Sequence, residues 1–517
     1  MDIINYISKL CGKNKNAEER TMLSLQPIDG EPEYNVPLST HQIHFEFTTL
    51  KGLFYFRCIQ MFSSELNIPS TIIRADLLRI TRGMKKNIKV CIEYPYVDEY
   101  YRDTYYSFYS RKHNRYNRYC FRLTFFSSDV SENNYYDINS LDEKCYGYCV
   151  LRPTCKRSIG YTFFSPLIYR RHDFLTCLCK RVISVKGRLI CISAFPFCGQ
   201  DGEMISCAET SVSMIFDYLS RRYNKYSRLL PSQISSMISD SIIDRKQPSK
   251  GVDIETISAI MNANGINTRQ YSKVDQDSVS LGKNEYQSDD FYRLLHIYIE
   301  SGFPLYVITK KHALIVCGRQ NKLFVNHPKL LVMDDNKKPY SYLENESDIT
   351  GFVVPMSENI LLEANDIVSR DIIAKVSRDY PLANFTDNST EYYHRVFLTT
   401  SRSLKSHFVN SQISPELRNS IVCIAMPKFV WVCESFKIEH STRAIHDIPI
   451  VSLLVLDTTE YSENYNHLLF AKTQTAILIP ADDKTHMQRK QYFFYRYNDE
   501  IHPFVNNLKG EHNNWNL

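Results

Sequence analysis

The sequence predicts an α+β protein built from three domains. At 517 residues the chain is too long for one ordinary core, because a domain takes about 150 residues. Its composition, 43% hydrophobic and 23% charged, excludes a wholly disordered or collagen-like chain. Helical periodicity in the middle third is followed by short strand-like runs, whereas both ends mix the two patterns. We therefore expect a mixed α/β domain at 1–140, an α+β domain with a helical half and an antiparallel sheet at 141–356, and an α/β domain at 357–517.

The N-terminal part of the chain alternates strand-like and helical segments. Residues 42–47 place Ile43, Phe45 and Phe47 on one strand face, and residues 71–82 have helical spacing. The polar stretch 127–139 marks the expected domain boundary. A strand-like run at 89–96 precedes this stretch. After it a new segment opens at 146–153, and further strand-like runs lie at 161–164 and 182–195.

A long helix is expected from Ser206 onward. Apolar residues share one face of it, namely Ala208, Val212, Ile215, Phe216 and Leu219. Ser206 and Glu209 form a Ser-x-x-Glu capping box, which puts Cys207 in the first helical turn. The other predicted helices are 231–239, 252–264, 290–301 and 358–379, and the other predicted strands are 305–309, 313–317, 322–326, 429–436 and 450–456.

Four residues of the middle domain can form a thiol-based catalytic site. A cysteine is a good nucleophile as a thiolate, and a helix N-terminus and a nearby imidazole both stabilise that charge at Cys207. His312 opens an apolar strand, and Asn326 closes the next predicted strand, so an antiparallel pairing would place the Asn326 oxygen beside the imidazole. Gln200, seven residues before Cys207, can donate to the oxyanion of a tetrahedral intermediate.

This order of Gln, Cys at a helix start, His opening a strand and Asn closing the next resembles that of papain-like cysteine peptidases. The sequence is most similar to the compact branch that includes the bacteriocin-leader-processing peptidases, over about residues 198–355. Gly-Val-Asp at 251–253 and Gly-Phe-Pro-Leu at 302–305 also resemble segments of that branch. In the branch, Asp is more common than Asn in the third catalytic position. The resemblance implies attack of Cys207 on an amide, an acyl-enzyme and its release by water, with no cofactor and no metal.

The expected function is therefore a regulated intracellular bacterial cysteine protease that cleaves peptide or isopeptide bonds of a protein or peptide substrate. One context that fits such a protease is an effector in a defence or toxin-type system. The flanking domains would select substrates, bind a regulatory protein or support self-association. The same triad serves transamidation and deamidation, which the sequence leaves open.

The alternative is a catalytically inactive papain-like protein that binds protein or nucleic acid through its Tyr- and Arg-rich N-terminal region. Residues 102–122 hold six basic residues, seven aromatic residues and one acid, Asp103. Interleaved Arg and Tyr suit single-stranded nucleic acid, a protein partner or an ordinary strand pair at the surface. A net charge of +5 over the whole chain argues against nucleic acid as the general partner.

The fifteen cysteines point to a reducing compartment. Their number is odd and the N-terminus lacks the features of a signal peptide, so we expect a cytoplasmic protein with mostly free thiols. The longest apolar runs are of strand length, so no membrane span is expected. The densest thiol group could bind zinc, although its spacing fits poorly and core packing is the favoured interpretation. This group is Cys145, Cys149, Cys155, Cys177 and Cys179.

Overall fold

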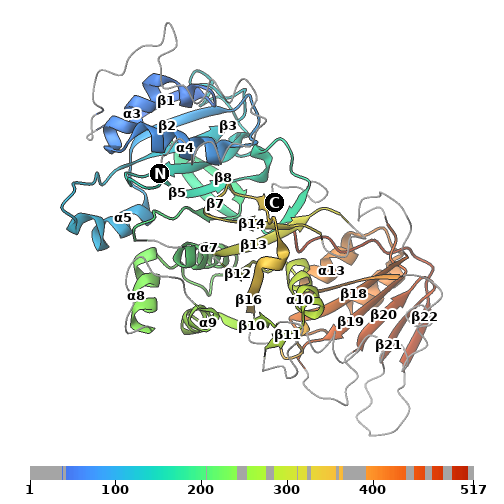
Figure 1. Cartoon of the computed structure of the whole chain (residues 1–517). Coiled ribbons are helices and arrows are strands. Elements are labelled where there is room, and N and C mark those ends of the chain that lie inside the picture. Colours follow the sequence, from blue (N-terminus) through green and yellow to red (C-terminus); the bar gives the residue numbers. More distant parts are fainter. Residues whose placement is uncertain are drawn as a thin grey trace.

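The computed structural model is an α+β fold with three large sheets (Figure 1). The residues it describes are 38, 42–204, 207–241, 253–274, 284–310, 312–322, 328–356, 360–364, 392–437, 448–459, 468–480 and 492–510. In Figure 1 the N-terminal sheet is blue to teal, the middle sheet is mainly yellow and the C-terminal sheet is orange.

The first sheet is antiparallel and has the strand order β1-β2-β3-β4-β5-β9. Its strands are β1 (His44–Thr49), β2 (Lys89–Tyr96), β3 (Cys120–Phe126), β4 (Cys145–Leu151), β5 (Ile159–Phe164) and β9 (Phe197–Cys198). The helices between them are α3 (Phe56–Leu66), α4 (Ser70–Thr81), α5 (Glu99–Ser107) and α6 (Leu141–Lys144). A hairpin of β7 (Cys179–Val185) and β8 (Arg188–Ala194) packs against β4 and β5. Because β3 and β4 are paired neighbours, the predicted boundary at residue 140 falls inside this sheet.

The middle unit places its helices before most of its strands, as the sequence predicts. Its main helices are α7 (Cys207–Arg222), α8 (Pro231–Ser241), α9 (Ile254–Ala263) and α10 (Ser288–Glu300). Its sheet has the order β11-β10-β16-β12-β13-β14-β15, and β6 pairs with β13 outside this path. The strands are β6 (Phe174–Thr176), β10 (Asn267–Lys273), β11 (Glu285–Tyr286), β12 (Leu305–Thr309), β13 (Ala313–Gln320), β14 (Leu330–Met333), β15 (Ser341–Tyr342) and β16 (Ile349–Met356). The predicted apolar face of α7 is buried and the helix packs against β12 and β13.

The C-terminal sheet is an antiparallel meander in sequence order. Its strands are β17 (Tyr392–Thr400), β18 (Phe429–Lys437), β19 (Ser452–Asp457), β20 (Leu468–Thr473), β21 (Ala476–Pro480) and β22 (Tyr492–Arg496), with helices α13 (Ser401–Asn410) and α14 (Pro415–Val422). α10 lies between this sheet and the middle sheet and contacts both β13 and β17 (Figure 1).

Two connections join the units at β13. Thr176 of β6 pairs with Gly318 of β13, and its backbone also exchanges hydrogen bonds with Lys509 near the C-terminus. At Gly318 a Cβ atom would lie only 2.0 Å from the Leu175 carbonyl oxygen, so this close approach of β6 requires glycine.

The second connection is a buried ion-pair network. Glu300 at the end of α10 pairs with Arg319 of β13 and accepts from Arg395 Nε of β17 at 2.8 Å. Arg395 Nη1 also donates to Glu434 of β18 at 2.8 Å and to the Phe504 carbonyl at 2.7 Å. Burial alone would raise the pKa of Glu300, but the two arginines lower it to about 2.

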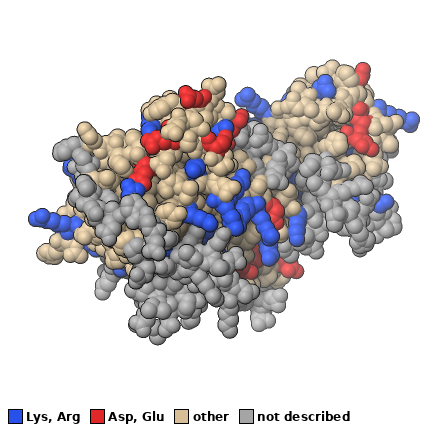
Figure 2. Space-filling view, turned by 90° about the horizontal axis from the view of Figure 1, so that it is seen from above, with Lys and Arg blue, Asp and Glu red and all other residues tan. Residues whose placement is uncertain are grey.

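Charges are nearly balanced over the chain but not over each face. In the view from above, Lys and Arg side chains gather in the middle of the molecule with fewer Asp and Glu among them (Figure 2). Within the part of the chain that is described, no helix is both long enough and apolar enough to cross a bilayer.

We predict that Arg395→Met lowers the free energy of unfolding by about 3–5 kcal/mol, because it leaves Glu300 and Glu434 buried without a shared cation. Urea unfolding measures this change. Arg402→Met on the exposed side of α13 is the matched control and should stay within about 0.5 kcal/mol of the original chain. Equal stability of the two variants would refute a structural role for the network.

Candidate active site

Cys207 is the first residue of α7 and is half-buried. The buried face of α7 holds the helix against β13, so the position of its first turn is fixed by core packing. Thr210 Oγ1 donates to the Cys207 carbonyl at 3.0 Å. The predicted capping box includes Ser206, which lies outside the described residues, whereas Glu209 is buried in the first turn. The thiol therefore lies at a helix N-terminus, where the helix dipole favours negative charge.

His312 lies directly before β13, as the sequence predicts. Thr309 at the end of β12 fixes its backbone, since Thr309 N donates to the His312 carbonyl at 2.8 Å. The Thr309 hydroxyl also donates to that carbonyl at 2.8 Å and accepts from His312 N at 3.1 Å. The imidazole is therefore presented from the start of a strand whose backbone is hydrogen-bonded to Thr309.

Two carboxylates lie beside the imidazole, and both follow β14. Antiparallel pairing of β13 with β14 brings the end of β14 next to the start of β13. Asp334 Oδ1 lies 2.9 Å from His312 Nε2, and Asp335 Oδ1 lies 3.1 Å from the same nitrogen. Asp335 Oδ2 also accepts from Thr210 Oγ1 of α7 at 3.2 Å, so this carboxylate links the helix to the imidazole.

The third predicted member of the triad, Asn326, lies outside the described residues. After β13, the next described strand along the chain that pairs with it is β14, which begins at Leu330. The residue that occupies the predicted orienting position next to His312 is Asp334. The signal for it was present in the sequence Leu-Leu-Val-Met-Asp-Asp at 330–335, an apolar run that ends in two acids.

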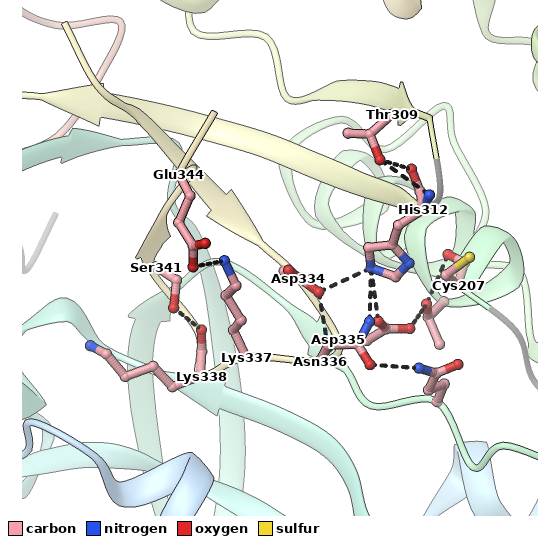
Figure 3. A network of polar contacts seen from close by, with 12 residues as sticks. Cys207, Thr309, His312, Asp334, Asp335, Asn336, Lys337, Lys338, Ser341 and Glu344 are labelled. Atoms are coloured by element: carbon pink, nitrogen blue, oxygen red, sulfur yellow. Dashed lines mark hydrogen bonds and ion pairs between the residues drawn. The ribbon is translucent and has the colours of Figure 1, made fainter. Parts of the chain in front are cut away.

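Figure 3 shows the imidazole of His312 between the two carboxylates on one side and Cys207 on the other. Burial on its own would lower the pKa of His312. Hydrogen bonds to Asp334, Asp335 and the Cys207 thiol outweigh burial and hold this pKa well above its usual value of 6.5. Burial likewise opposes ionisation of Asp334, but its hydrogen bond to His312 lowers the pKa of this carboxyl below its usual 3.8. The imidazole is therefore an imidazolium at neutral pH, close to the thiol.

Gln200 joins the same network through an asparagine. Its Nε2 donates to Asn336 Oδ1 at 3.1 Å, and Asn336 Nδ2 lies 3.2 Å from His312 Nε2. Asn336 N also donates to Asp334 Oδ1 at 2.9 Å. The predicted site residues Gln200, Cys207 and His312 thus lie in one cluster. In this state the Gln200 amide binds Asn336, which gives it a positioning contact in addition to its predicted role as an oxyanion donor.

Two arginines of the first sheet unit hold the turn that carries the acids. Arg157, from the loop between β4 and β5, donates to the Asp335 carbonyl at 3.2 Å and to Asn336 Oδ1 at 2.7 Å. Arg79 of α4 donates to the carbonyls of Asp335 at 3.2 Å and Lys337 at 3.1 Å. Sequence reasoning missed both arginines, because nothing local marks a contact across more than 170 residues.

Two groups of residues can be considered as metal sites, namely the five cysteines and the carboxylates beside His312. Among the described residues, no cluster of three or more metal-ligating side chains includes any of the five cysteines of the possible zinc group, and of these five Cys155 is exposed. In the described part of the chain such a cluster is formed by His312, Asp334 and Asp335. One imidazole nitrogen and two carboxylate oxygens suit a divalent cation. That nitrogen is already hydrogen-bonded to Asp334, so a cation would have to displace the proton and this contact.

The Tyr- and Arg-rich tract forms helix α5 and the short helical turn Tyr109–Arg111 before β3, rather than a strand pair. Several of its side chains make contacts within the molecule. Arg102 lies over the rings of Tyr106 and Tyr119, and Asp103 accepts from the Ser232 backbone and hydroxyl at the start of α8.

Searches against protein-family models and curated proteins found no match for this chain.

We predict that Asp334→Asn lowers the pKa of His312, because the variant keeps the burial and loses a charged acceptor. A histidine whose pKa is raised contributes stability that is fully present below pH 6.5 and is lost as the pH rises through the folded-state pKa. Asp334, whose pKa is lowered, contributes stability above pH 3.8 that is lost as the pH falls through its folded-state pKa.

NMR titration of the imidazole C–H signals measures the change in the His312 pKa. It should show an imidazolium that persists into mild alkali in the original chain and that deprotonates at lower pH in Asp334→Asn. Glu344→Gln, which removes an exposed carboxylate that pairs with Lys337, should leave the titration unchanged.

Arg157→Ala should loosen the acid-bearing turn, because it removes hydrogen bonds to two of its residues. We expect the free energy of unfolding to fall by about 1–3 kcal/mol and His312 to lose its proton at lower pH. Lys156→Ala, next to it on the exposed side of the same loop, is the control. An unchanged His312 titration in Arg157→Ala would show that the turn holds its place without the first sheet unit.

Proposed function

We propose that the chain is a papain-like cysteine peptidase in which Cys207 is the nucleophile, His312 the acid–base and Asp334 the group that orients the imidazole. The observation that supports this most is the position of a charged imidazole between a thiol at a helix N-terminus and a carboxylate. Asp in the third position agrees with the residue most common in the peptidase branch that the sequence resembles.

The proposed reaction begins with attack of the Cys207 thiolate on the carbonyl carbon of an amide. The carbonyl π electrons move to oxygen, and the Cys207 backbone N–H and the Gln200 amide are the candidate donors to this oxyanion. His312 then gives its proton to the departing nitrogen as the C–N bond breaks, which leaves a thioester and a free amine. The neutral imidazole takes a proton from water, the hydroxide displaces the thiolate, and a carboxylic acid is released.

The contacts of Asp334 explain why the imidazole can carry out both proton transfers. A carboxylate hydrogen-bonded at Nε2 keeps the ring oriented with Nδ1 available on the other side. Asp335 adds a second negative charge and a link to α7. If a side-chain amine replaces water in the second step, the same residues perform transamidation. A regulated role inside a bacterial cell remains part of the proposal.

The test compares thiols within the same chain. At pH 7 an ordinary exposed thiol is only a few per cent thiolate, whereas the proposed mechanism requires a thiolate at Cys207. Cys207 should therefore react with iodoacetamide roughly tenfold or more faster than the exposed Cys155 and Cys423. Mass spectrometry of each cysteine-containing peptide gives the three rates in one experiment. His312→Ala should bring the Cys207 rate down to that of the other two.

Catalysis itself is tested by profiling peptides cleaved in a lysate by the original chain, with Cys207→Ser as the control. Neo-termini that appear only with the intact thiol support peptidase activity. Fast alkylation of Cys207 without any such cleavage would redirect the proposal to transamidation, which amine incorporation into proteins would then reveal. Slow alkylation that does not depend on His312 would refute the enzyme proposal.

A further inference from the structure

A group of cations lies at the end of the turn that carries the acids, on the side away from Cys207. Lys338 follows this turn directly, and Figure 3 shows its side chain extending away from His312. Its ammonium lies 4.0 Å from the centre of the buried Tyr169 ring and 3.7 Å from the point where a Cβ would stand on Gly83. Arg82, the residue before Gly83, is close enough to act on its charge.

The loops around Lys338 are held together by backbone contacts. Met84 and Tyr169 form an isolated antiparallel bridge, and Lys85 N donates to the Ile168 carbonyl at 3.0 Å. Arg170 N donates to the Gly83 carbonyl at 3.1 Å, and Arg170 Nε donates to the Met84 carbonyl at 2.8 Å. These contacts join the segments that carry Arg82 and Arg170, and the Lys338 side chain lies against both, at Gly83 and at Tyr169.

These cations have no counter-ion within the part of the chain that the structure describes. Among the described residues, no carboxylate forms an ion pair with Lys338, Arg82 or Arg170. The lysine next in the chain differs, since Lys337 pairs with Glu344 at 2.7 Å. Burial and the neighbouring Arg82 lower the pKa of Lys338 to about 8. A half-buried ammonium beside a guanidinium is unfavourable, and among the described residues the Tyr169 ring is the group seen to offset this cost.

We propose that Lys338, Arg82 and Arg170 form a binding site for the phosphate group of a ligand. A phosphate dianion supplies the negative charge that this group lacks and offers oxygens to both the ammonium and the guanidinium forks. The source of the phosphate is either a small phosphorylated molecule or the backbone of a polynucleotide. The inference does not depend on Cys207 chemistry. It places an anion at one end of the turn whose other end carries Asp334.

The experiment is isothermal titration of the full chain with pyrophosphate, followed by inorganic phosphate. Loss of one charge-assisted contact should weaken binding about tenfold or more in Lys338→Met and in Arg82→Gln. Lys337→Met is the matched control on the same turn and should bind within about twofold of the original chain. Binding that is unchanged in Arg82→Gln and Lys338→Met, or no saturable binding by the original chain, would overturn the proposal.

A second measurement needs no substitution and guards against misfolding of Lys338→Met. Because its pKa is low, Lys338 should be acetylated by acetic anhydride at pH 8 faster than Lys337, and pyrophosphate should slow this reaction at Lys338 only. Equal protection of both lysines would contradict a site at Lys338.

The source of the phosphate is decided by competition with a single-stranded oligonucleotide. Displacement of pyrophosphate by the oligonucleotide, with affinity that falls steeply with salt and in Arg82→Gln, identifies a polynucleotide. Binding of pyrophosphate without competition identifies a small phosphorylated ligand. Oligonucleotide binding that is unchanged in Arg82→Gln and Lys338→Met would place nucleic acid elsewhere on the molecule and leave a small phosphorylated ligand as the occupant of this site.

Discussion

The hydrogen bonds that β13 makes with β12 on one side and β14 on the other determine where His312 and Asp334 of the candidate active site lie. Pairing with β12 brings Thr309 to the backbone of His312, and pairing with β14 brings Asp334 to its imidazole. The helix that begins at Cys207 packs against the same strand. A thiol, an imidazole and a carboxylate from different parts of the sequence are therefore positioned by the same strand, as the proposed catalysis would require.

Buried charges lie at both ends of β13, and they are balanced at one end but not at the other. Near the far end, Arg319 and Arg395 share Glu300, and this arrangement fits a structural network in which each charge is compensated. At the near end, one imidazolium faces two carboxylates, one of which also accepts from Thr210. The surplus negative charge there favours a protonated imidazole next to the Cys207 side chain.

Local patterns predicted the elements well and their long-range partners poorly. The predicted strands 89–96 and 305–309 are confirmed as β2 and β12, and the helix after Ser206 begins at Cys207. The single run predicted at 182–195 is instead a hairpin, since Lys186 and Gly187 take positive φ values and form its turn. The domain boundary at 140 and the choice of Asn326 rested on which strands pair, and strand pairing depends on contacts that no short window contains. The helix start and the strand start are local features, so Cys207 and His312 were found, whereas Asp334, Arg79 and Arg157 were not.

The close passage of β6 over Gly318 bears on how such a chain can evolve. One glycine admits a strand from the N-terminal part, and that strand in turn pairs with the segment at Lys509. β13 of the middle sheet is thus bordered by β6, and β6 in turn is bordered by backbone near the C-terminal end of the described chain. A segment limited to 141–356 would lose Arg79, three strands of the first sheet and Lys509, which pairs with Thr176. The regions before and after this segment are consequently not exchangeable modules. Recombination that replaced either region would have to preserve the backbone contacts of β6 with β13 and with Lys509.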